Sequence, residues 1–359
     1  MGRSPDALIW LGTAMKPRVA GLGVLAALGA AVLMLALSAF GLGDAQENQP
    51  RRIAFQIATG STGGTYFPVG ELIAGIISHP PGVGRCEAPD ACGPEGLIAS
   101  ARTSDGAVAN ALAVNNGEME SGLAQSDVVA EAWAGEGAFR KAGKQTHLRV
   151  IAALFPEDVL IVAAQSAHIA SVADLRGKRV SLGTENSGTI VTARAVLAAY
   201  RMTERDLVAH HYSPDLAAQM LQKNKLDAFF FVGGAPVPLV QTLTASKTAK
   251  LIPIDGDGRA RLLKAVPSLS AGTIDTNVYS NTAAVETVRG RALFIVGDSV
   301  PDDLVYGITR ALFAPANHDA LAEGSRSSSL IRLDTAAKNL PAPLHPGAQR
   351  FFRARGVLR

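Results

Sequence analysis

The sequence predicts an α/β fold with two lobes and mostly parallel sheets. Short apolar segments alternate with amphipathic ones along most of the chain, as in repeated β-α-β units. Residues 227–232 (DAFFFV) are almost entirely apolar, which is typical of a strand buried on both faces. Two segments, 53–72 and 179–200, share a plan of strand, small polar loop and helix start. We therefore expect one such corner in each lobe and a cleft between the lobes.

The first corner reads IAFQIATGSTGGTYFPVGEL. Its apolar run, 53–57, ends before Gly60, and Thr65 begins an amphipathic helix. The first N–H groups of a helix have no intrahelical partner and carry partial positive charge, so this end suits a carboxylate or phosphate. Gly63 and Gly64 would let a ligand approach the backbone closely. A plain strand–turn–helix corner accounts for the same residues as well as an anion site does.

Further polar residues follow other expected strands, at the carboxyl ends where ligands of open α/β sheets bind. Residues 184–189 (TENSGT) follow the strand of the second corner, and residues 103–106 (TSDG) and 125–127 (QSD) follow shorter strands. Gln125 and Ser126 are placed to hydrogen-bond a ligand. Residues 103–106 form a second candidate anion-binding end. For both of these shorter segments, simple capping of a helix is the alternative.

The remaining elements are expected in a regular alternation. Gly233 and Gly234 follow an apolar strand and leave room for a ligand. The PED tripeptide at 156–158 is expected to separate two strands, with its two acids in a solvated turn rather than in catalysis. Residues 272–288 are polar, and we expect them to be irregular. The other expected strands are 97–101, 149–155, 159–164, 251–254 and 291–297. The other expected helices are 128–133, 171–177, 216–221, 259–266, 301–313 and a short basic helix after the loop at 341–348.

The N-terminus has the features of an export signal. Three basic residues precede a nearly uncharged stretch at 19–43, and the small residues at 43–45 (GDA) suit a signal peptidase. We expect residues 1–45 to be a signal peptide, with Gln46 as the new N-terminus. The apolar stretch exceeds the roughly 7–15 residues of a usual signal core, so an uncleaved N-terminal anchor stays open. Either way, the body is expected outside the cytoplasm, in the periplasm.

Two cysteines, Cys86 and Cys92, enclose a loop rich in Gly, Pro and Asp. In an exported chain this spacing indicates a local disulfide. A metal site is not expected, because no other cysteine and no nearby histidine in the sequence completes a ligand set.

Composition and motifs argue against several other classes. The 359 residues suggest about two domains, and a content of 48% hydrophobic and 18% charged residues allows a large core. A net charge of +3, without long basic runs and with 5% aromatic residues, does not favour nucleic acid as a partner. The chain has no P-loop, no dinucleotide fingerprint after its first strand, no G-x-S-x-G elbow and no H-x-x-x-H pair. We expect no catalytic residues, no metal and no cofactor, and therefore not an enzyme.

Six segments together resemble the TAXI family of extracytoplasmic solute receptors, the binding-protein component of one branch of TRAP transporters. They run in the family's order over nearly the whole chain that follows the export signal. The segments are 58–70 (ATGSTGGTYFPVG), 119–128 (MESGLAQSDV), 171–183 (SVADLRGKRVSLG), 186–189 (NSGT), 227–236 (DAFFFVGGAP) and 343–352 (PLHPGAQRFF).

The resemblance implies a two-lobed periplasmic binding protein fold of type II, which closes about a hinge on a small anionic solute. We expect residues 46–160 to begin the first lobe, 161–289 to form the second lobe and 290–359 to return to the first. The hinge is expected near 159–164 and 292–297. The implied solute is glutamate or a related small carboxylate, and the implied partner is an ion-driven TRAP membrane permease with fused subunits.

Carried over by position, the resemblance also implies a set of ligand contacts. Asp105 departs from the family's usual pattern and brings negative charge close to the expected anion site, where Arg102 could offset it. The implied contacts are Thr62, Gly63, Gly64, Thr65, Tyr66, Ser104, Gln125, Ser126, Ser187, Gly188, Thr189, Phe231, Gly233 and Gly234.

Two other functions stay open on the same fold. One is a membrane-anchored periplasmic sensory or scaffold protein that keeps residues 19–43. The other is an enzyme on a binding-protein fold, for which the sequence offers no evident acid–base pair.

Overall fold

The structure is a computed structural model and describes residues 52–82, 86, 88–276, 278–280 and 283–358. The expected signal segment at 1–45, with the alternative anchor at 19–43, lies outside these residues. Within the described ranges, no helix is both long enough and apolar enough to cross a membrane.

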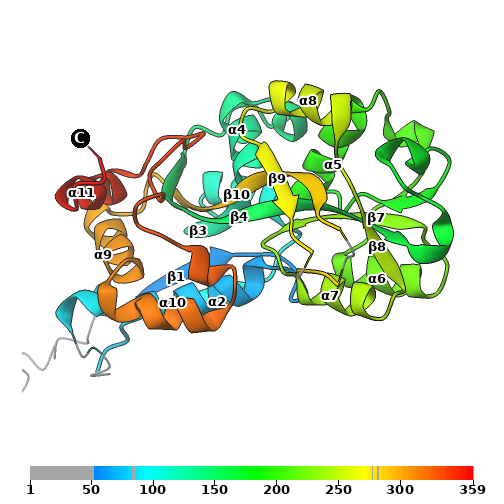
Figure 1. Cartoon of the computed structure of the whole chain (residues 1–359). Helices are drawn as coiled ribbons and strands as arrows, with labels where there is room; N and C mark the ends of the chain where they lie inside the picture. Colours follow the sequence, from blue (N-terminus) through cyan, green and yellow to red (C-terminus); the bar gives the residue numbers. More distant parts are fainter. Residues whose placement is uncertain (1–51, 83–85, 87, 277, 281–282, 359) are drawn as a thin grey trace, which may run out of the picture. The chain divides into compact units, whose positions relative to one another are not determined.

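The strands of the described residues form one ten-stranded sheet, with helices on both of its faces (Figure 1). The early strands confirm the expected positions of the two corners to within a few residues. In chain order the strands are β1 (Ile53–Ala58), β2 (Leu97–Arg102), β3 (Ser121–Gln125), β4 (Leu148–Ala164), β5 (Arg179–Ser181), β6 (Val208–His210), β7 (Ala228–Gly233), β8 (Ala249–Ile252), β9 (Ser270–Ile274) and β10 (Val285–Gly297).

The same five-strand order occurs at both ends of the sheet. One end has the order β2-β1-β3-β10-β4, and the other has the order β6-β5-β7-β4-β8. In each, the first three strands are parallel and the fourth runs antiparallel to them. This duplicated order confirms the two-lobed α/β fold. We call the end that contains β1–β3 the first lobe and the end that contains β5–β8 the second lobe.

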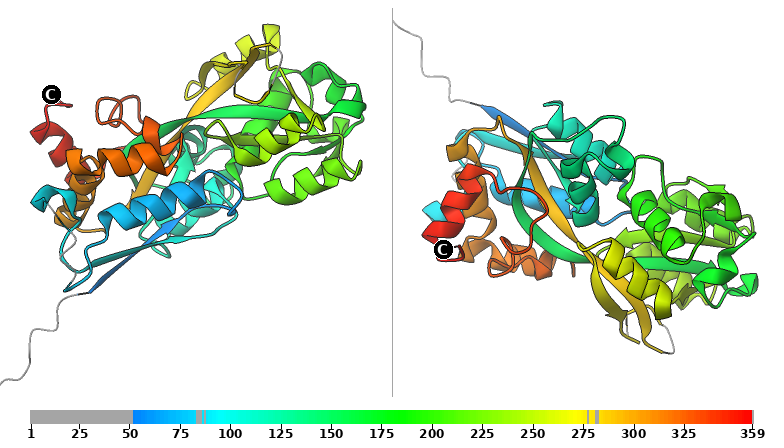
Figure 2. Two further views of the ribbon diagram at one scale, coloured as in Figure 1. Left: turned by 60° about the horizontal axis from the view of Figure 1, so that its bottom comes forward. Right: turned by 90° about the horizontal axis from the view of Figure 1, so that it is seen from above.

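Two long strands, β4 and β10, pass from one lobe to the other. Residues 148–158 of β4 pair with β10, and residues 158–163 pair with β7. Residues 292–296 of β10 pair with β3, and its first five residues pair with β9. Figure 2 shows the two strands side by side in both of its views. Strand pairing is therefore continuous between the lobes.

Two of the sequence predictions about these strands were wrong. The expected break at 156–158 does not occur, since β4 is a single strand. Pro156 pairs with Arg291 beside a register shift at which β4 has one residue more than β10, and such an irregularity accommodates a proline that has no N–H to donate. The expected irregular segment 272–288 contains β9 and the start of β10. Their ribbon has one exposed face, which gives the segment its polar composition.

The sheet is mixed rather than mostly parallel. Every antiparallel pairing among the described strands involves β4 or β10. These two strands connect the lobes directly, without the helical crossover that a parallel connection requires. The parallel prediction is therefore correct only for β1–β3 and for β5–β7.

Three clusters of buried side chains hold the layers together. Alternate residues of β4 enter different clusters, because successive side chains of a strand point to opposite faces. Val159 and Ile161 pack with α3, α4 and α5, in a cluster that spans both lobes. Leu160 and Val162 pack with α6 and α7 in the second lobe. The third cluster joins β1 to α2, α9 and α11.

The helices follow the strands closely, and α7 and α10 were not predicted. The described helices are α2 (Tyr66–Ile77), α3 (Ala107–Asn115), α4 (Ser126–Ala134), α5 (Gly188–Ala199), α6 (Pro214–Gln222), α7 (Pro238–Ala245), α8 (Gly256–Ala265), α9 (Asp302–Leu312), α10 (His318–Gly324) and α11 (Pro346–Ala354).

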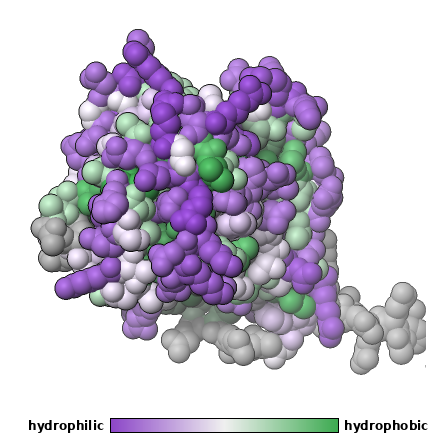
Figure 3. Space-filling view, turned by 90° about the vertical axis from the view of Figure 1, so that its right-hand side faces the viewer, coloured by the Kyte–Doolittle hydropathy of each residue, from purple (hydrophilic) through white to green (hydrophobic). Residues whose placement is uncertain are grey.

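The face of the molecule at the second lobe is largely hydrophilic, with hydrophobic residues in small separate areas (Figure 3). Among the described residues, the exposed large hydrophobic side chains are Ile98 and Val208. They lie on β2 and β6, the two edge strands of the main strand order. Isolated residues of this kind are normal on a soluble surface.

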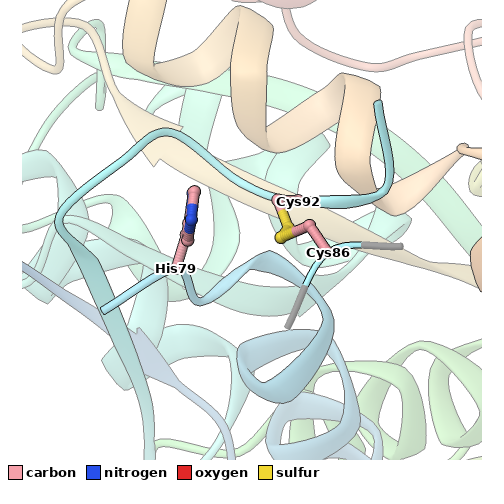
Figure 4. Close-up of side chains that lie close together, drawn as sticks. All are labelled: His79, Cys86 and Cys92. Carbon is pink, nitrogen blue, oxygen red and sulfur yellow. A yellow bond between two sulfur atoms is a disulfide. The ribbon is translucent and has the colours of Figure 1, made fainter. Parts of the chain in front are cut away.

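Cys86 and Cys92 form the expected disulfide, with their Cα atoms 5.7 Å apart. Figure 4 shows His79 close to this pair, so the expectation that no histidine lies nearby was wrong. The fold brings His79 back because its N–H donates to the Leu97 carbonyl, at the start of β2. Metal binding requires thiolate sulfur, so these two cysteines are not ligands while they are oxidised to a disulfide.

We expect the double variant Cys86→Ser/Cys92→Ser to unfold more easily than the wild type by about 2 kcal/mol, because the bond closes a short loop. Urea denaturation followed by circular dichroism measures this difference. Treating the wild-type protein with a reducing agent serves as the control and should produce the same loss. An unchanged urea midpoint in both experiments would contradict a stabilising role.

Candidate functional site

A cavity of about 230 Å³ lies between the two lobes, at the carboxyl ends of β1, β3, β5 and β7. Both predicted corners contribute to it, as does the start of α6. Its lining consists of Gly60, Ser61, Gly64, Thr65, Tyr66, Ser104, Asp105, Gly106, Ala107, Gln125, Gly183, Thr184, Ser187, Gly188, Thr189, Tyr212, Ser213, Pro214, Ala217, Phe230, Phe231 and Val232.

Two of the helices that begin at this cavity, α2 and α5, come from opposite lobes. Thr65 and Tyr66 stand at the start of α2, and Gly188 and Thr189 stand at the start of α5. Within the described part of the chain, the backbone N–H groups of these four residues have no acceptor. Two sets of unpaired donors, each at the positive end of a helix dipole, therefore face the cavity.

Gly188 is required for the close approach of the lobes. A Cβ atom at this position would overlap Oε1 of Gln125, which comes from the end of β3. The Gln125 side chain, 5% exposed, therefore lies against the start of α5 in the other lobe. A side chain larger than hydrogen at 188 would separate these two elements.

Direct hydrogen bonds join the lobes beside the cavity. The carbonyl of Asn186 accepts from the N–H groups of Val108 and Ala109, at 3.1 and 3.2 Å. The Thr184 hydroxyl donates to the Asp105 carbonyl at 3.0 Å. The expected second anion-binding end at 103–106 is therefore partly occupied, because a protein carbonyl already accepts from the second and third N–H groups of α3.

A buried asparagine, Asn110, holds the strand ends of the first lobe in place. Its side-chain amide donates to the carbonyls of Thr59 and Leu123, at 2.6 and 2.7 Å, and its oxygen accepts from the Ser104 hydroxyl at 2.6 Å. The Ser104 hydroxyl therefore already has hydrogen-bond partners within the protein. Sequence reasoning missed Asn110; its only signal is a polar residue among the buried positions of an apolar helix.

Most of the predicted ligand contacts meet at the cavity. Those that line it are Gly64, Thr65, Tyr66, Ser104, Gln125, Ser187, Gly188, Thr189 and Phe231. Those outside the lining are Thr62, Gly63, Ser126, Gly233 and Gly234.

Several of the predicted contacts that lie outside the lining contact other residues of the protein instead. The Ser126 hydroxyl accepts from the Arg291 N–H at 3.2 Å, so it belongs to the sheet. Gly234 faces Ser327, and Gly63 faces the carboxylate of Asp215 on α6. A Cβ atom at Gly233 would lie 2.7 Å from Oγ1 of Thr65, so Gly233 packs against this residue of the other lobe. Proximity in the sequence to a lining residue did not ensure access to the cavity.

The start of α6 also reaches the cavity, and sequence reasoning missed it. Tyr212, Ser213 and Pro214 line the cavity, and Ser213 caps the helix by accepting from the Leu216 N–H. A serine followed by proline is a usual helix start, so this signal was present in the sequence. What the sequence lacked was the position of this helix relative to the other lobe.

The cavity contains little formal charge. Its lining among the described residues has one acid, Asp105, and no lysine, arginine or histidine. Asp105 is exposed at the rim, and its Oδ2 accepts from the Asn186 amide at 3.4 Å. Arg102, which was expected to offset Asp105, is also exposed and is not part of the lining. The polar part of the lining therefore consists mainly of backbone N–H and hydroxyl groups, and Phe230, Phe231 and Val232 form an apolar wall.

An acidic cluster lies behind the Tyr66 side of the cavity. The Tyr66 hydroxyl donates to Oε2 of Glu157 at 3.0 Å. Burial, together with the negative charges of Asp127 and Asp158, raises the pKa of Glu157 to about 8. Burial also raises the pKa of Asp127, although Thr192 and the Val128 N–H donate to it.

The expected solvated turn at Glu157 and Asp158 was therefore wrong, since both side chains are buried. The reason lies in β4, which does not stop at Pro156 and carries both acids into the middle of the sheet. Asp158 pairs with Arg289 of β10 at 2.7 Å, whereas Glu157 has no cationic partner among the described residues.

A family model matches residues 57–356, which include all of the lining described above. The chain belongs to the NMT1-like family. The match covers most of the chain and both corners at the cavity.

Solved structures similar to this NMT1-like chain include two sulfonate-binding proteins. The alkanesulfonate-binding protein SsuA from Xanthomonas axonopodis pv. citri, bound to MOPS, is 17% identical with a TM-score of 0.41, covering 72% of this chain and 74% of its own. The periplasmic aliphatic sulphonate binding protein SsuA from Escherichia coli is 15% identical with a TM-score of 0.41, covering 79% and 80%.

We expect Glu157→Gln to gain stability relative to the wild type as the pH rises from about 5 to about 8. The folded-state pKa of about 8 lies above the unfolded value of 4.5, so the wild type loses stability across this interval while the amide does not titrate. The pH-dependent gain should be on the order of 2–4 kcal/mol. Thermal unfolding of both proteins over this pH range measures it, and parallel stability curves would exclude a neutral buried Glu157.

Proposed function

We propose that the protein is an extracytoplasmic solute receptor that captures a small carboxylate between its lobes. The observation that carries this proposal is the pair of helix starts, α2 and α5, whose unpaired N–H groups face one cavity from opposite lobes. Two such ends can hold one anionic group from both sides. Closure would remove the group from water, which strengthens each hydrogen bond.

The proposed solute is glutamate or a related amino acid or dicarboxylate. The hydroxyl of Thr189 and the amide of Gln125 have no partner among the described residues and lie in the lining, so they remain available to the solute. The wall formed by Phe230, Phe231 and Val232 suits an aliphatic chain. A cavity of about 230 Å³ has room for a molecule of this size.

The proposed partner is a TRAP-type membrane permease with fused subunits, as the resemblance to the TAXI family implies. Capture would occur in the periplasm, after export directed by residues 1–45. In this scheme the protein delivers a solute and does not transform it. The lining supports this reading, because it places no nucleophile beside a base among the described residues.

We further propose that the lobes move about β4 and β10. Residues 46–160 and 290–359 would form the first lobe, and 161–289 the second. The hinge is placed near 159–164 and 292–297. The register shift between Arg291 and Leu293, where β4 has one residue more than β10, lies at this boundary and is a local irregularity where a strand bends.

A carboxylate that binds only the folded protein should raise its melting temperature. We expect a shift with at least one of L-glutamate, L-glutamine, glutarate, succinate and valerate, measured by differential scanning fluorimetry at saturating concentration. Native mass spectrometry of the purified protein tests for a co-purified acid. Absence of any shift and of any bound molecule would contradict solute capture.

Gly188→Ala should weaken binding of the same acids by about tenfold or more, because the added Cβ displaces Gln125 from the start of α5. Isothermal titration calorimetry measures the change. The matched control is Gly75→Ala on α2, where a Cβ meets no atom within 4 Å. The control should bind as the wild type does and be more stable by about 0.5–1 kcal/mol. Equal affinity in all three proteins would show that closure at Gly188 is not needed.

The alternative, a membrane-anchored sensory or scaffold protein on the same fold, depends on the fate of residues 19–43. N-terminal sequencing of the protein isolated from the periplasm distinguishes the two. A start near Gln46 supports the soluble receptor, and retention of residues 19–43 supports the anchored form.

A further inference from the structure

A buried carboxyl group beside the cavity lacks a full set of hydrogen-bond partners. Glu157 is 1% exposed, and its Oε2 accepts from the Tyr66 hydroxyl at 3.0 Å. Its other oxygen, Oε1, has no partner within the described part of the chain. A buried carboxylate with one hydrogen bond is strongly disfavoured relative to its neutral acid.

The charged groups around Glu157 do not compensate for its burial. Asp127 approaches from α4 and Asp158 is adjacent on β4, and both are acids. On β10, Arg289 and Arg291 flank the residue that pairs with Glu157. Arg289 is bound to Asp158, and Arg291 donates to two backbone carbonyls of the 335–338 segment. No cation of the described chain is therefore directed at Glu157.

Tyr66 links this acid to the cavity. It is the first residue of α2, it lines the cavity, and its hydroxyl contacts the Glu157 carboxyl group. A tyrosine hydroxyl has one proton to donate and can also accept. Whether this hydroxyl can offer a donor or only an acceptor to the cavity therefore depends on whether Glu157 accepts or donates the proton of their shared hydrogen bond.

We propose that Glu157 is a positioning residue that stays protonated when an anionic solute binds, and so makes the Tyr66 hydroxyl a donor to that solute. This inference rests on the proposed function and specifies a determinant of its anion selectivity. With a proton on Oε2, Glu157 donates to the Tyr66 oxygen, and the Tyr66 O–H is free to donate into the cavity. Without it, the carboxylate accepts the Tyr66 O–H, and only oxygen lone pairs face the anion.

The proton balance follows directly. Below its pKa of about 8, Glu157 already carries the proton, and binding an anion needs no further one. Above that pH, each solute bound to the protonated form takes up one proton from solution. Affinity for an anion should therefore be constant at low pH and fall by up to about tenfold per pH unit above the pKa.

The test compares the wild type with Glu157→Gln by isothermal titration calorimetry between about pH 6 and about pH 10. Glutarate is the first probe and L-glutamate the second. The ratio of the two proteins' affinities cancels any titration of the probe itself. The side-chain amide of the variant donates at every pH, so we expect a constant ratio up to about pH 8 and a falling wild-type affinity above it. Titration in two buffers with different ionisation heats should show net proton uptake by the wild type only.

Two further variants separate this role from a structural one. Tyr66→Phe removes the hydroxyl and should weaken binding by about tenfold at neutral pH. Glu131→Gln is the matched control, because burial also raises the pKa of Glu131 while its side chain is not part of the lining. The control should retain the wild-type pH profile.

Each outcome has one meaning. A wild-type profile that falls above about pH 8, together with a flat profile in Glu157→Gln, supports the inference. Binding of the probes with the same profile in both proteins overturns the proton coupling and leaves the proposed function intact. Failure of both probes and of all the acids screened above to bind either protein overturns the proposed function and this inference together.

Discussion

The architecture depends on two antiparallel strands that belong to both lobes at once. β4 is the fifth strand of one half of the sheet and the fourth of the other, and β10 pairs with it over much of its length. Because backbone hydrogen bonding is continuous through this pair, the lobes cannot separate without bending or breaking it. The carboxyl ends of four other strands converge on the space beside it, and the cavity forms there. The same geometry explains why a carboxyl group on β4 can lie directly behind a residue of the cavity wall.

In the proposed function, the cavity would recognise a charged group without a formal counter-charge. Each helix terminus contributes roughly 0.3–1 kcal/mol toward an anion at an exposed site, and more where water is excluded. An arginine clamp would provide a stronger and more directional contact. Backbone donors have a different advantage, since their positions are fixed by the helices and no flexible side chain must be ordered on binding. Such a site would discriminate between solutes by their shape and by the number of hydrogen bonds they make. Its affinity would depend on how completely the lobes exclude water.

The sequence predicted individual helices and strands better than it predicted how they are arranged in space. The corners at 53–72 and 179–200 were predictable because helix starts, glycines and apolar runs are local signals. The continuous β4 was not predictable, since a proline such as Pro156 normally ends a strand and only the register shift beside it, with its extra residue in β4, accommodates it. Ser126 and Gly234 illustrate the same limit at the site: each follows a strand that ends at the cavity, yet each faces a neighbour that sequence periodicity cannot reveal. Gln125 and Gly188 were selected separately, and only the fold places them in contact.

The hydrogen bonds between the Asn186 carbonyl and the start of α3 would limit where the cleft can accept negative charge. At the start of α3, a carbonyl of the protein itself accepts from Val108 and Ala109, whereas the first two N–H groups of α2 and of α5 have no acceptor among the described residues. A second anionic group on the same solute, if directed toward the α3 side, would meet the Asn186 carbonyl and the Asp105 carboxylate instead of free N–H groups. In the proposed function, the contact that joins the lobes at the rim would therefore also restrict the solute: one end of the cleft would accept negative charge and the other would disfavour it.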